Sequence, residues 1–449
     1  MAMSGLQIYK LLPKTNCKDC GFPTCLAFAM KLAAKQADLS ACPHVSEESK
    51  AALAASSAPP MRLIVLGSGD NEVKVGNETE MFRHNKTFYN PAAIFLRVKD
   101  TQPIAEIEAA VAEAMAYQVE RVGMMLSLDG VAVENASGDK ETLVAAIKAA
   151  RAKADSKPLI VMTDDPATAQ AGLQEAGEKP MLYAAKAENW QEMVATAKAA
   201  GASLVVYEKD GLTSLANLAE NVKDAGVEDI VLDPGARGIA DSLALFTQIR
   251  RLALTKNFRP LGYPIVAFPG EGAASPEEEA IIAAQHIAKY GGFIVLDHFD
   301  PAVAYILLTL RLNIYTDPQK PIQVSPGIYE IGDPGPDSPL LVTTNFSLTY
   351  FSVAGELDGS GVPSWLLITD SEGMSVLTAW AAGNFDAETI AKAAQTFDLE
   401  GKVDHRKIII PGYVAVISGE LEEEMPGWEI LVGPREAVDI PAYLKLWQN

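Results

Sequence analysis

Cysteine is missing from most of this 449-residue chain, because all four of its cysteines fall within the first 42 residues. Long apolar runs are missing as well. None approaches the roughly 18 residues of a transmembrane helix, so we do not expect a membrane protein. Basic residues are scarce, with 37 Lys and Arg against 58 Asp and Glu and a net charge of −21. This balance argues against nucleic acid or an anionic membrane as the main partner and favours a soluble, cytoplasmic protein.

Two familiar site motifs are also absent. The chain has five histidines, none of them in an H-E-x-x-H or paired arrangement, so we expect no histidine-based metal site. No G-x-G-x-x-G follows the first strand expected in the C-terminal part, which disfavours a nicotinamide dinucleotide as ligand. The cysteines are therefore the main candidates for a metal site.

The four cysteines form one local group with the spacing C-x2-C-x4-C-x16-C, as Cys17, Cys20, Cys25 and Cys42. The close triplet, a helix expected over Leu26–Leu39 and the Cys-Pro pair at position 42 favour a [4Fe–4S] cluster. A structural zinc site is the main alternative, but zinc sites usually pair two short cysteine knuckles and the second is missing here. Disulfides are a weaker alternative, since no secretory signal precedes the cysteines.

Composition divides the chain into three expected domains. An Ala/Ser/Pro stretch over 47–60 reads as a linker, and a second Pro-rich passage surrounds 316–326. We therefore expect a cluster module at 1–58, a central domain at 59–320 and a C-terminal domain at 321–449.

The central domain alternates short apolar runs with Ala-rich helical patterns, which predicts a TIM (β/α)8 barrel. The eight expected strands are Ala93–Val98, Val122–Leu126, Pro158–Met162, Met181–Ala184, Ser203–Tyr207, Asp229–Leu232, Pro264–Phe268 and Phe293–Leu296. The alternating segment Met61–Tyr89 could form hairpins that plug the bottom of this barrel.

Polar residues follow the expected barrel strands, where barrel enzymes place their chemistry. They are Asp129, Asp164, Asp165, Glu208, Lys209, Asp233, Glu271, Asp297 and His298. A catalytic interpretation would select Asp233–Gly238 and Asp297-His298. We favour the simpler interpretation, in which such acids cap the next helix and His298 is packed or hydrogen-bonded, and we assign no catalytic residue.

The C-terminal part has the pattern of a Rossmann-like open α/β sheet, with strands at Leu340–Thr343, Trp365–Thr369, Lys407–Ile410 and Glu429–Val432. Such sheets bind ligands beyond the carboxyl ends of their strands. The candidate binding residues in these loops are Thr343, Thr344, Asn345, Phe346, Thr349, Asp370, Ser371, Glu372, Gly373, Met374, Gly412, Gly433, Pro434 and Arg435. On pattern alone, the loops could also be ordinary turns and helix caps.

With these three parts in this order, the chain resembles the large (gamma) subunit of the corrinoid iron–sulfur protein of the acetyl-CoA (Wood–Ljungdahl) pathway. The resemblance covers its whole length. The most specific segments are Asn16–Cys25, Thr343–Tyr350 and Leu366–Met374. The resemblance implies that the four cysteines hold a [4Fe–4S] cluster and that the C-terminal loops contact a corrinoid. It also implies a heterodimer with a small (delta) subunit.

The resemblance further implies a methyl carrier. Its Co(I) would accept a methyl group from methyltetrahydrofolate through a methyltransferase and deliver it to acetyl-CoA synthase/carbon monoxide dehydrogenase. The cluster, supplied by a low-potential electron donor, would return oxidised Co(II) to Co(I). The chain lacks the D-x-H-x-x-G motif through which many cobalamin domains supply a histidine, so we expect a base-off cobamide. Domains that carry the cluster and the corrinoid are expected to be mobile.

Two other functions remain open from the sequence. The barrel could be an enzyme that transfers methyl or pterin groups, with the cluster as structural support. Alternatively, the chain could be an electron-transfer adaptor whose C-terminal domain has no cofactor. The carrier interpretation describes a subunit that acts with partner enzymes more than a free-standing catalyst.

Overall fold

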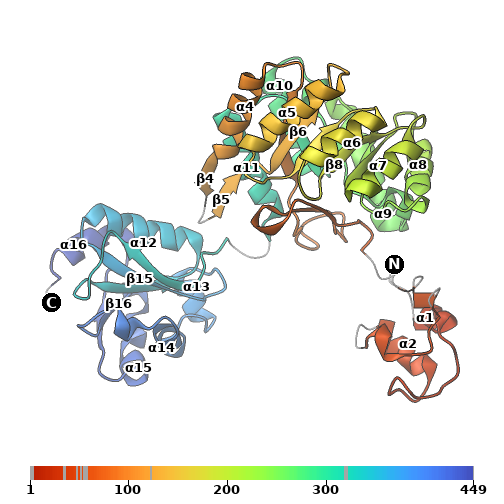
Figure 1. Ribbon diagram of the computed structural model, residues 1–449. Helices are drawn as coiled ribbons and strands as arrows, with labels where there is room; N and C mark the ends of the chain where they lie inside the picture. Colours follow the sequence, from red (N-terminus) through yellow and green to blue (C-terminus); the bar gives the residue numbers. More distant parts are fainter. Residues whose placement is uncertain are drawn as a thin grey trace. The chain divides into compact units, whose positions relative to one another are not determined.

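The computed structural model describes residues 5–33, 37–46, 49–50, 53, 59–121, 124–317 and 322–447 (Figure 1). Contacts divide the chain into two compact units, Met1–Tyr117 with Ser127–Tyr315, and Gln118–Leu126 with Thr316–Asn449. Most of the linker expected over 47–60 lies outside the described residues. In the part that is described, no helix is both long and apolar enough to cross a bilayer.

The N-terminal module contains two short helices, α1 (Gly5–Leu11) and α2 (Cys25–Ala33), and a 3-10 turn at Leu39–Ala41. Gly5 lets the helices approach closely, because a Cβ there would lie 3.2 Å from the Cα of Met30. The helix expected over Leu26–Leu39 is shorter than predicted: α2 ends at Ala33, and residues 34–36 lie outside the described range.

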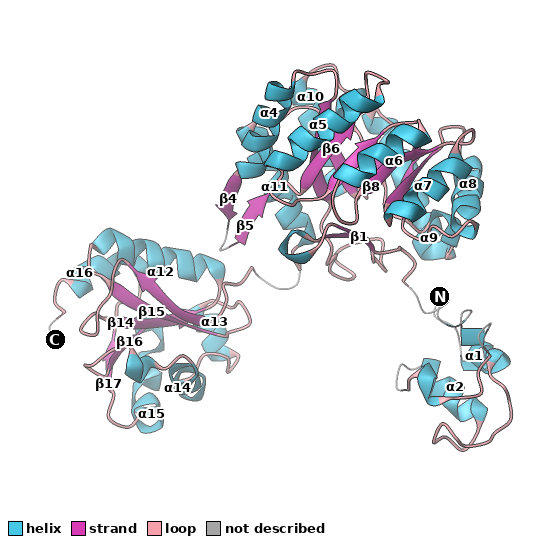
Figure 2. Ribbon diagram, in the orientation of Figure 1, coloured by secondary structure: helices cyan, strands magenta, loops and turns pink. Residues whose placement is uncertain are grey.

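The central domain is a closed barrel of eight parallel strands in chain order, as predicted (Figure 2). The order β10-β9-β8-β7-β6-β3-β12-β11 is closed by a parallel bridge between Leu232 and Ile265. The strands are β3 (Ala93–Lys99), β6 (Gly130–Glu134), β7 (Leu159–Met162), β8 (Met181–Ala185), β9 (Ser203–Tyr207), β10 (Ile230–Asp233), β11 (Val266–Ala267) and β12 (Phe293–Leu296).

One helix follows each strand and covers the outside of the barrel, as in a TIM barrel (Figure 1). These helices are α4 (Ile104–Ala116), α5 (Lys140–Lys153), α6 (Pro166–Glu175), α7 (Trp190–Ala200), α8 (Leu212–Asp224), α9 (Ile239–Lys256), α10 (Pro276–Ala288) and α11 (Pro301–Tyr315). Asp165 caps α6 by accepting the amide of Thr168 at 2.7 Å, which is the structural role expected for some strand-end acids.

The second predicted barrel strand was wrong. Residues of Val122–Leu126 that the structure describes belong to a separate two-stranded sheet of β4 (Gln118–Arg121) and β5 (Met124–Ser127). The barrel strand is β6, which starts at Gly130. A Cβ on Gly130 would lie 2.4 Å from the ring of Phe95 and 2.3 Å from the carbonyl of Pro158, so the adjoining strands require glycine there.

A hairpin closes the bottom of the barrel, as predicted for part of Met61–Tyr89. Strand β1 (Ile64–Leu66) pairs antiparallel with β2 (Val73–Val75). Ile64, Leu66 and Val75 of this hairpin are buried in the same cluster as the inward-facing barrel residues. These apolar side chains fill the interior of the barrel. The barrel is therefore a packed core, as is usual for this fold.

The C-terminal domain is a five-stranded open sheet in the order β13-β15-β14-β16-β17. All four predicted strands are confirmed, as β14 (Leu340–Thr344), β15 (Ser364–Thr369), β16 (Lys407–Ile410) and β17 (Glu429–Val432). The sequence did not predict β13 (Gly327–Ile331), an antiparallel edge strand whose residues are only half-buried. Helices α12 (Ser347–Ser360), α13 (Val376–Ala381), α14 (Ala387–Thr396), α15 (Ser418–Glu424) and α16 (Ile440–Leu444) pack on the sheet.

The strand order reverses at β14. The chain runs from β14 to its neighbour β15 on one side, and then to β16 on the other side. In open α/β sheets, the carboxyl ends of the two strands at such a reversal leave a crevice between the loops. This is where the structure places the cavity described next.

Candidate functional site

The cavity in the C-terminal domain has a volume of about 410 Å³, within the range of small-molecule sites. It lies at the carboxyl ends of β14, β16 and β17, at the reversal of strand order. Five predicted binding residues line it: Thr343, Thr349, Gly433, Pro434 and Arg435. The candidate set did not include other lining residues, among them Leu348, Ser375, Leu377, Tyr413 and Glu436.

Within the described chain, Thr343 has a hydroxyl without a hydrogen-bond partner in the wall of this cavity. Its side chain is 1% exposed, and its hydroxyl has no hydrogen-bond partner among the described residues. Thr344 has the same property but does not line the cavity. A buried hydroxyl without a partner costs about 1–3 kcal/mol, so a polar group of a ligand at Thr343 would be favourable.

Asn345 organises the loop that follows β15. Its side-chain carbonyl accepts the amides of Ser371 at 3.0 Å and Gly373 at 2.9 Å. Its amide group donates to Asp370 Oδ1 at 3.2 Å. Asn345 is 1% exposed and therefore acts as an internal brace between the β14 and β15 loops.

The other predicted binding residues lie at the same edge of the sheet but outside the cavity wall. They are Thr344, Asn345, Phe346, Asp370, Ser371, Glu372, Gly373, Met374 and Gly412. Gly412 has a structural reason to be glycine, because a Cβ there would lie 2.5 Å from the carbonyl of Gly433. This close approach joins the β16 and β17 loops into one wall of the cavity.

His405 is the one histidine between residues 316 and 449, and both of its ring nitrogens are engaged. Nε2 lies 2.9 Å from the carbonyl of Ser338, and Nδ1 accepts the amide of Lys407 at 3.0 Å. The imidazole therefore braces a loop and offers no lone pair to a metal.

The cysteines of the N-terminal module differ in exposure. Cys25 and Cys42 are buried, Cys20 is half-buried and Cys17 is exposed, and all four are free thiols. Three of them share an apolar cluster with Phe28 and its neighbours, while Cys17 lies outside that cluster. No disulfide forms, so the thiols remain available as metal ligands.

Asn16 connects the cysteine loop to the start of α2. Its backbone amide donates to the sulfur of Cys25 at 3.4 Å, and its side-chain carbonyl accepts the amide of Cys25 at 2.8 Å. Its φ of 51° lies in the left-handed region, where asparagine is better tolerated than most residues. Such an amide-to-sulfur bond is one of the interactions that set the potential of an iron–sulfur cluster.

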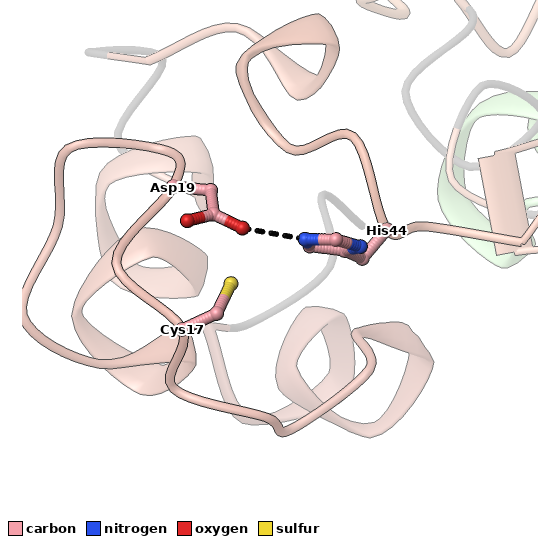
Figure 3. A group of neighbouring side chains, drawn as sticks. All are labelled: Cys17, Asp19 and His44. Carbon is pink, nitrogen blue, oxygen red and sulfur yellow. Dashed lines mark hydrogen bonds and ion pairs between the residues drawn. The ribbon is translucent and has the colours of Figure 1, made fainter.

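Cys17 lies beside a pair of polar side chains that the sequence did not single out. Figure 3 shows its sulfur directed toward Asp19 and His44, and His44 Nε2 lies 2.6 Å from Asp19 Oδ2. The hydrogen bond with His44 lowers the pKa of Asp19. In the described part of the chain, these three are the one group of metal-ligating side chains whose atoms all lie within 4.8 Å of one another.

The positions of the thiols bear on the choice of metal. A tetrahedral zinc with Zn–S bonds of about 2.3 Å would hold its sulfurs about 3.8 Å apart. No three of the four thiols, all of which the structure describes, lie within 4.8 Å of one another. The thiols are therefore not arranged around a single zinc ion, and four thiolates are the donor set of an iron–sulfur cluster.

The mouth of the barrel holds a network of ion pairs. Arg97 on β3 donates to both carboxylate oxygens of Asp297, at 2.6 and 2.7 Å, and to Glu271 at 2.7 Å. Arg237 donates to both oxygens of Asp233, at 2.9 and 3.0 Å. The acids that a catalytic interpretation would select are therefore already paired with two arginines.

Tyr183 completes the network by donating to Asp233 at 2.9 Å, and burial raises the pKa of its hydroxyl. Sequence reasoning missed Arg97 and Tyr183. It also misplaced Asp129, which lies at the opposite end of the barrel, accepts the amide of Ile94 at 2.7 Å and pairs with Arg311. The expectation for His298 is confirmed, because its Nδ1 lies 2.6 Å from Glu279.

Comparison with known proteins gives consistent matches. Residues 63–444 match the family described as CO dehydrogenase/acetyl-CoA synthase delta subunit, and residues 12–44 match the family described as "Putative Fe-S cluster". The solved structure of dihydropteroate synthase from Thermus thermophilus covers 57% of this chain and all of its own, at 16% identity and a TM-score of 0.39. That score is too low to support a functional comparison.

Relatives match over nearly the whole chain. The corrinoid/iron-sulfur protein large subunit of Moorella thermoacetica is 45% identical over 99% of both chains. The acetyl-CoA decarbonylase/synthase complex gamma subunits of Methanopyrus kandleri and Archaeoglobus fulgidus are 35% and 36% identical, over 99% and 98% of this chain and 97% and 98% of their own. These alignments cover 98–99% of this chain, whereas the delta-subunit match begins at residue 63, after the cysteines. The chain therefore belongs to the family of corrinoid/iron-sulfur protein large subunits and acetyl-CoA decarbonylase/synthase gamma subunits.

Proposed function

We propose that this chain is a corrinoid methyl carrier of acetyl-CoA metabolism, with a [4Fe–4S] cluster in its N-terminal module. The observation that carries the proposal is the cavity at the β14 reversal with the unpartnered hydroxyl of Thr343 in its wall. When bound, the corrinoid supplies a cobalt that accepts and releases a methyl group, and the cluster supplies single electrons that restore the reactive cobalt. We keep the expected domains 1–58, 59–320 and 321–449 as part of this proposal.

The cavity wall suits one face of a large, mainly apolar ring with polar edges. Leu348, Leu377 and Tyr413 are 69%, 45% and 43% exposed and line the same cavity, and apolar side chains that gather in this way mark binding sites. Thr343 offers a hydroxyl, and Arg435 offers a cation for polar groups at the edge. Asn345 would act indirectly, by holding the Asp370–Met374 loop in place.

The environment of His405 supports a base-off corrinoid. Both nitrogens of this histidine are already hydrogen-bonded, so it is not a free axial ligand for cobalt. Without a strong axial donor, a metal centre becomes easier to reduce, because the oxidised state loses stabilisation. A reducible cobalt is what a methyl acceptor needs.

Cys17, Cys20, Cys25 and Cys42 would hold the cluster. The apolar cluster around Cys25 and Cys42 keeps water from two of the thiolates, and the amide of Asn16 stabilises the charge on the sulfur of Cys25. The exposed Cys17 leaves one edge accessible to an electron donor.

Names of the relatives support membership of a larger assembly. We propose a small (delta) subunit as the direct partner, with a methyltetrahydrofolate methyltransferase and acetyl-CoA synthase/carbon monoxide dehydrogenase as alternating partners. A low-potential electron donor would serve the cluster, and the cytoplasm would be the site of action.

A barrel enzyme is the second candidate function, but the barrel mouth argues against it. Catalytic acids and bases need an accessible carboxylate with a suitable pKa. Here Asp233 is 0% exposed and bound to Arg237, while Asp297 is bound to Arg97.

A visible spectrum and metal analysis of the anaerobically purified protein, together with its small subunit, test the proposal. Corrinoid bands with about four irons per chain are expected. Iron without cobalt would favour the electron-transfer adaptor, and methyltransferase activity by this chain alone would favour the barrel enzyme.

A Cys20→Ala variant should still accept methyl groups but should not recover after oxidation of cobalt. Unimpaired recovery would refute the role assigned to the cluster.

A further inference from the structure

We propose that the exposed loop around Cys17 is the docking surface for an acidic protein that carries single electrons at low potential. The inference rests on the proposed function, because it assumes that Cys17 binds the cluster. It goes further by naming the surface through which electrons enter and the charge of the protein that brings them.

Charge is distributed very unevenly along this chain. Residues 1–46 contain five lysines, two aspartates, no arginine and no glutamate, which gives a formal charge of +3. The whole chain carries −21, so the remaining 403 residues carry −24. The cysteine module is therefore a basic segment on a strongly acidic protein.

Two of these lysines flank the exposed thiol. Lys14 and Lys18 are exposed and lie three residues before and one residue after Cys17. No carboxylate among the described residues forms an ion pair with either lysine, and Lys14 Nζ lies 5.7 Å from the centre of the Tyr9 ring. The acid nearest to them in the sequence, Asp19, is directed to His44, whose Nε2 lies 2.6 Å from its Oδ2.

Cys17 is also the most exposed of the four cysteines, so electrons would reach the cluster most directly through it. Cys25 and Cys42 are buried and Cys20 is half-buried, so a partner can approach the cluster most closely through Cys17. A cluster held by four thiolates is itself an anion and would repel an acidic partner. Lysines beside the exposed thiolate offset this repulsion and would steer an acidic partner to the productive orientation.

The same charges limit what the partner can be. The net charge of −21 on the whole chain disfavours an extended polyanion, such as a nucleic acid or an anionic membrane. A small acidic protein can contact the module alone. Electron-transfer encounters commonly use small interfaces of this kind, in which charge sets the association rate.

The test is stopped-flow reduction of the cluster in the full-length protein, with a reduced acidic ferredoxin as the probe. The double variant Lys14→Glu/Lys18→Glu should lower the second-order rate constant by about tenfold or more at low salt. The difference should shrink in high salt, where charges are screened. The matched control Lys153→Glu/Lys223→Glu makes the same change of charge at two exposed lysines of the barrel helices and should keep the wild-type rate.

Reduced methyl viologen, a small cation, separates docking from damage to the cluster. It should reduce the cluster in the Lys14/Lys18 variant at least as fast as in the wild type. A wild-type ferredoxin rate in this variant would overturn the docking surface, as would equal losses in both variants. If instead only the later transfer from cluster to cobalt were slowed, the lysines would face the chain's own acidic part and the proposal would be wrong. Absence of a cluster by iron analysis would refute the proposed function itself.

Discussion

His286 on α10 makes the stability of the barrel depend on pH. Its side chain is 1% exposed, and neither ring nitrogen has a hydrogen-bond partner in the described part of the chain. It packs against Phe246, with ring centres 5.2 Å apart. Burial, assisted by the charge of Arg237, lowers the pKa of His286 from 6.5 to about 4.

The sign of the effect follows from this shift. Between the two pKa values the unfolded chain binds a proton at His286 and the folded chain does not, so acid favours unfolding. The stability contributed by neutral His286 is complete above the unfolded pKa and is lost as the pH falls toward about 4. The difference between the unfolded and the folded pKa of His286 corresponds to about 3 kcal/mol in full, of which about 2 kcal/mol is lost by about pH 5.

The variant His286→Leu should lack this loss, because leucine fills a similar volume without a proton to bind. Urea unfolding followed by circular dichroism at about pH 7.5 and about pH 5 measures the change in the free energy of unfolding. The wild type should lose about 2 kcal/mol more than the variant over this interval. His84→Leu, at an exposed histidine beside Phe82, is the control and should lose as much as the wild type. Equal losses in the wild type and in His286→Leu would refute the reasoning.

Three further substitutions test the sites. Asn345→Ala leaves two buried amides without an acceptor and should lower the stability of the C-terminal domain by about 2 kcal/mol or more. Hydrogen exchange in the loop after β15 should become faster. An unchanged melting temperature would contradict this. Thr343→Val removes an unpartnered hydroxyl, so the protein without corrinoid should be at least as stable, while corrinoid retention measured by absorbance should fall. Equal retention would remove Thr343 from the binding site. Arg97→Met should destabilise the barrel by about 1–3 kcal/mol in urea unfolding, because it leaves the half-buried carboxylate of Asp297 without its charged partner. Arg97→Lys should restore only part of that loss, since lysine cannot make the two-pronged contact, and wild-type stability in either variant would argue against the network.

Strands were predicted correctly where an apolar run is continuous and has clear ends. Phe293–Leu296 is such a run, and it is a barrel strand as expected. The second barrel strand failed because the run over Met124–Ser127 is as apolar as β6, although Met124 and Met125 are 48% and 61% exposed. What distinguishes β6 is Gly130, and its requirement for a small residue depends on neighbours from other strands.

The candidate sites also contain residues that the local sequence indicates and residues that are brought together only by the fold. The cysteines were candidates from the sequence because their spacing is local, and Thr343 was a candidate because it lies near the end of a predicted strand, now β14. Arg97 lies 200 residues from Asp297, and it reaches that carboxylate only because β3 and β12 pair in one register. The exposed pair of Asp19 and His44 depends in the same way on how the loop folds back.

An apolar hairpin closes one end of the barrel, and the ion pairs of Arg97 and Arg237 occupy the other end. This arrangement limits how the barrel could acquire a new ligand or reaction. A new ligand cannot enter the mouth unless Arg97 or Arg237 releases its carboxylates, which leaves buried charge behind. Gaining a reaction in the barrel would therefore require at least two coordinated replacements, with an unstable intermediate between them. Loops at the edge of the C-terminal sheet face no such barrier, so new specificity is easier to acquire there.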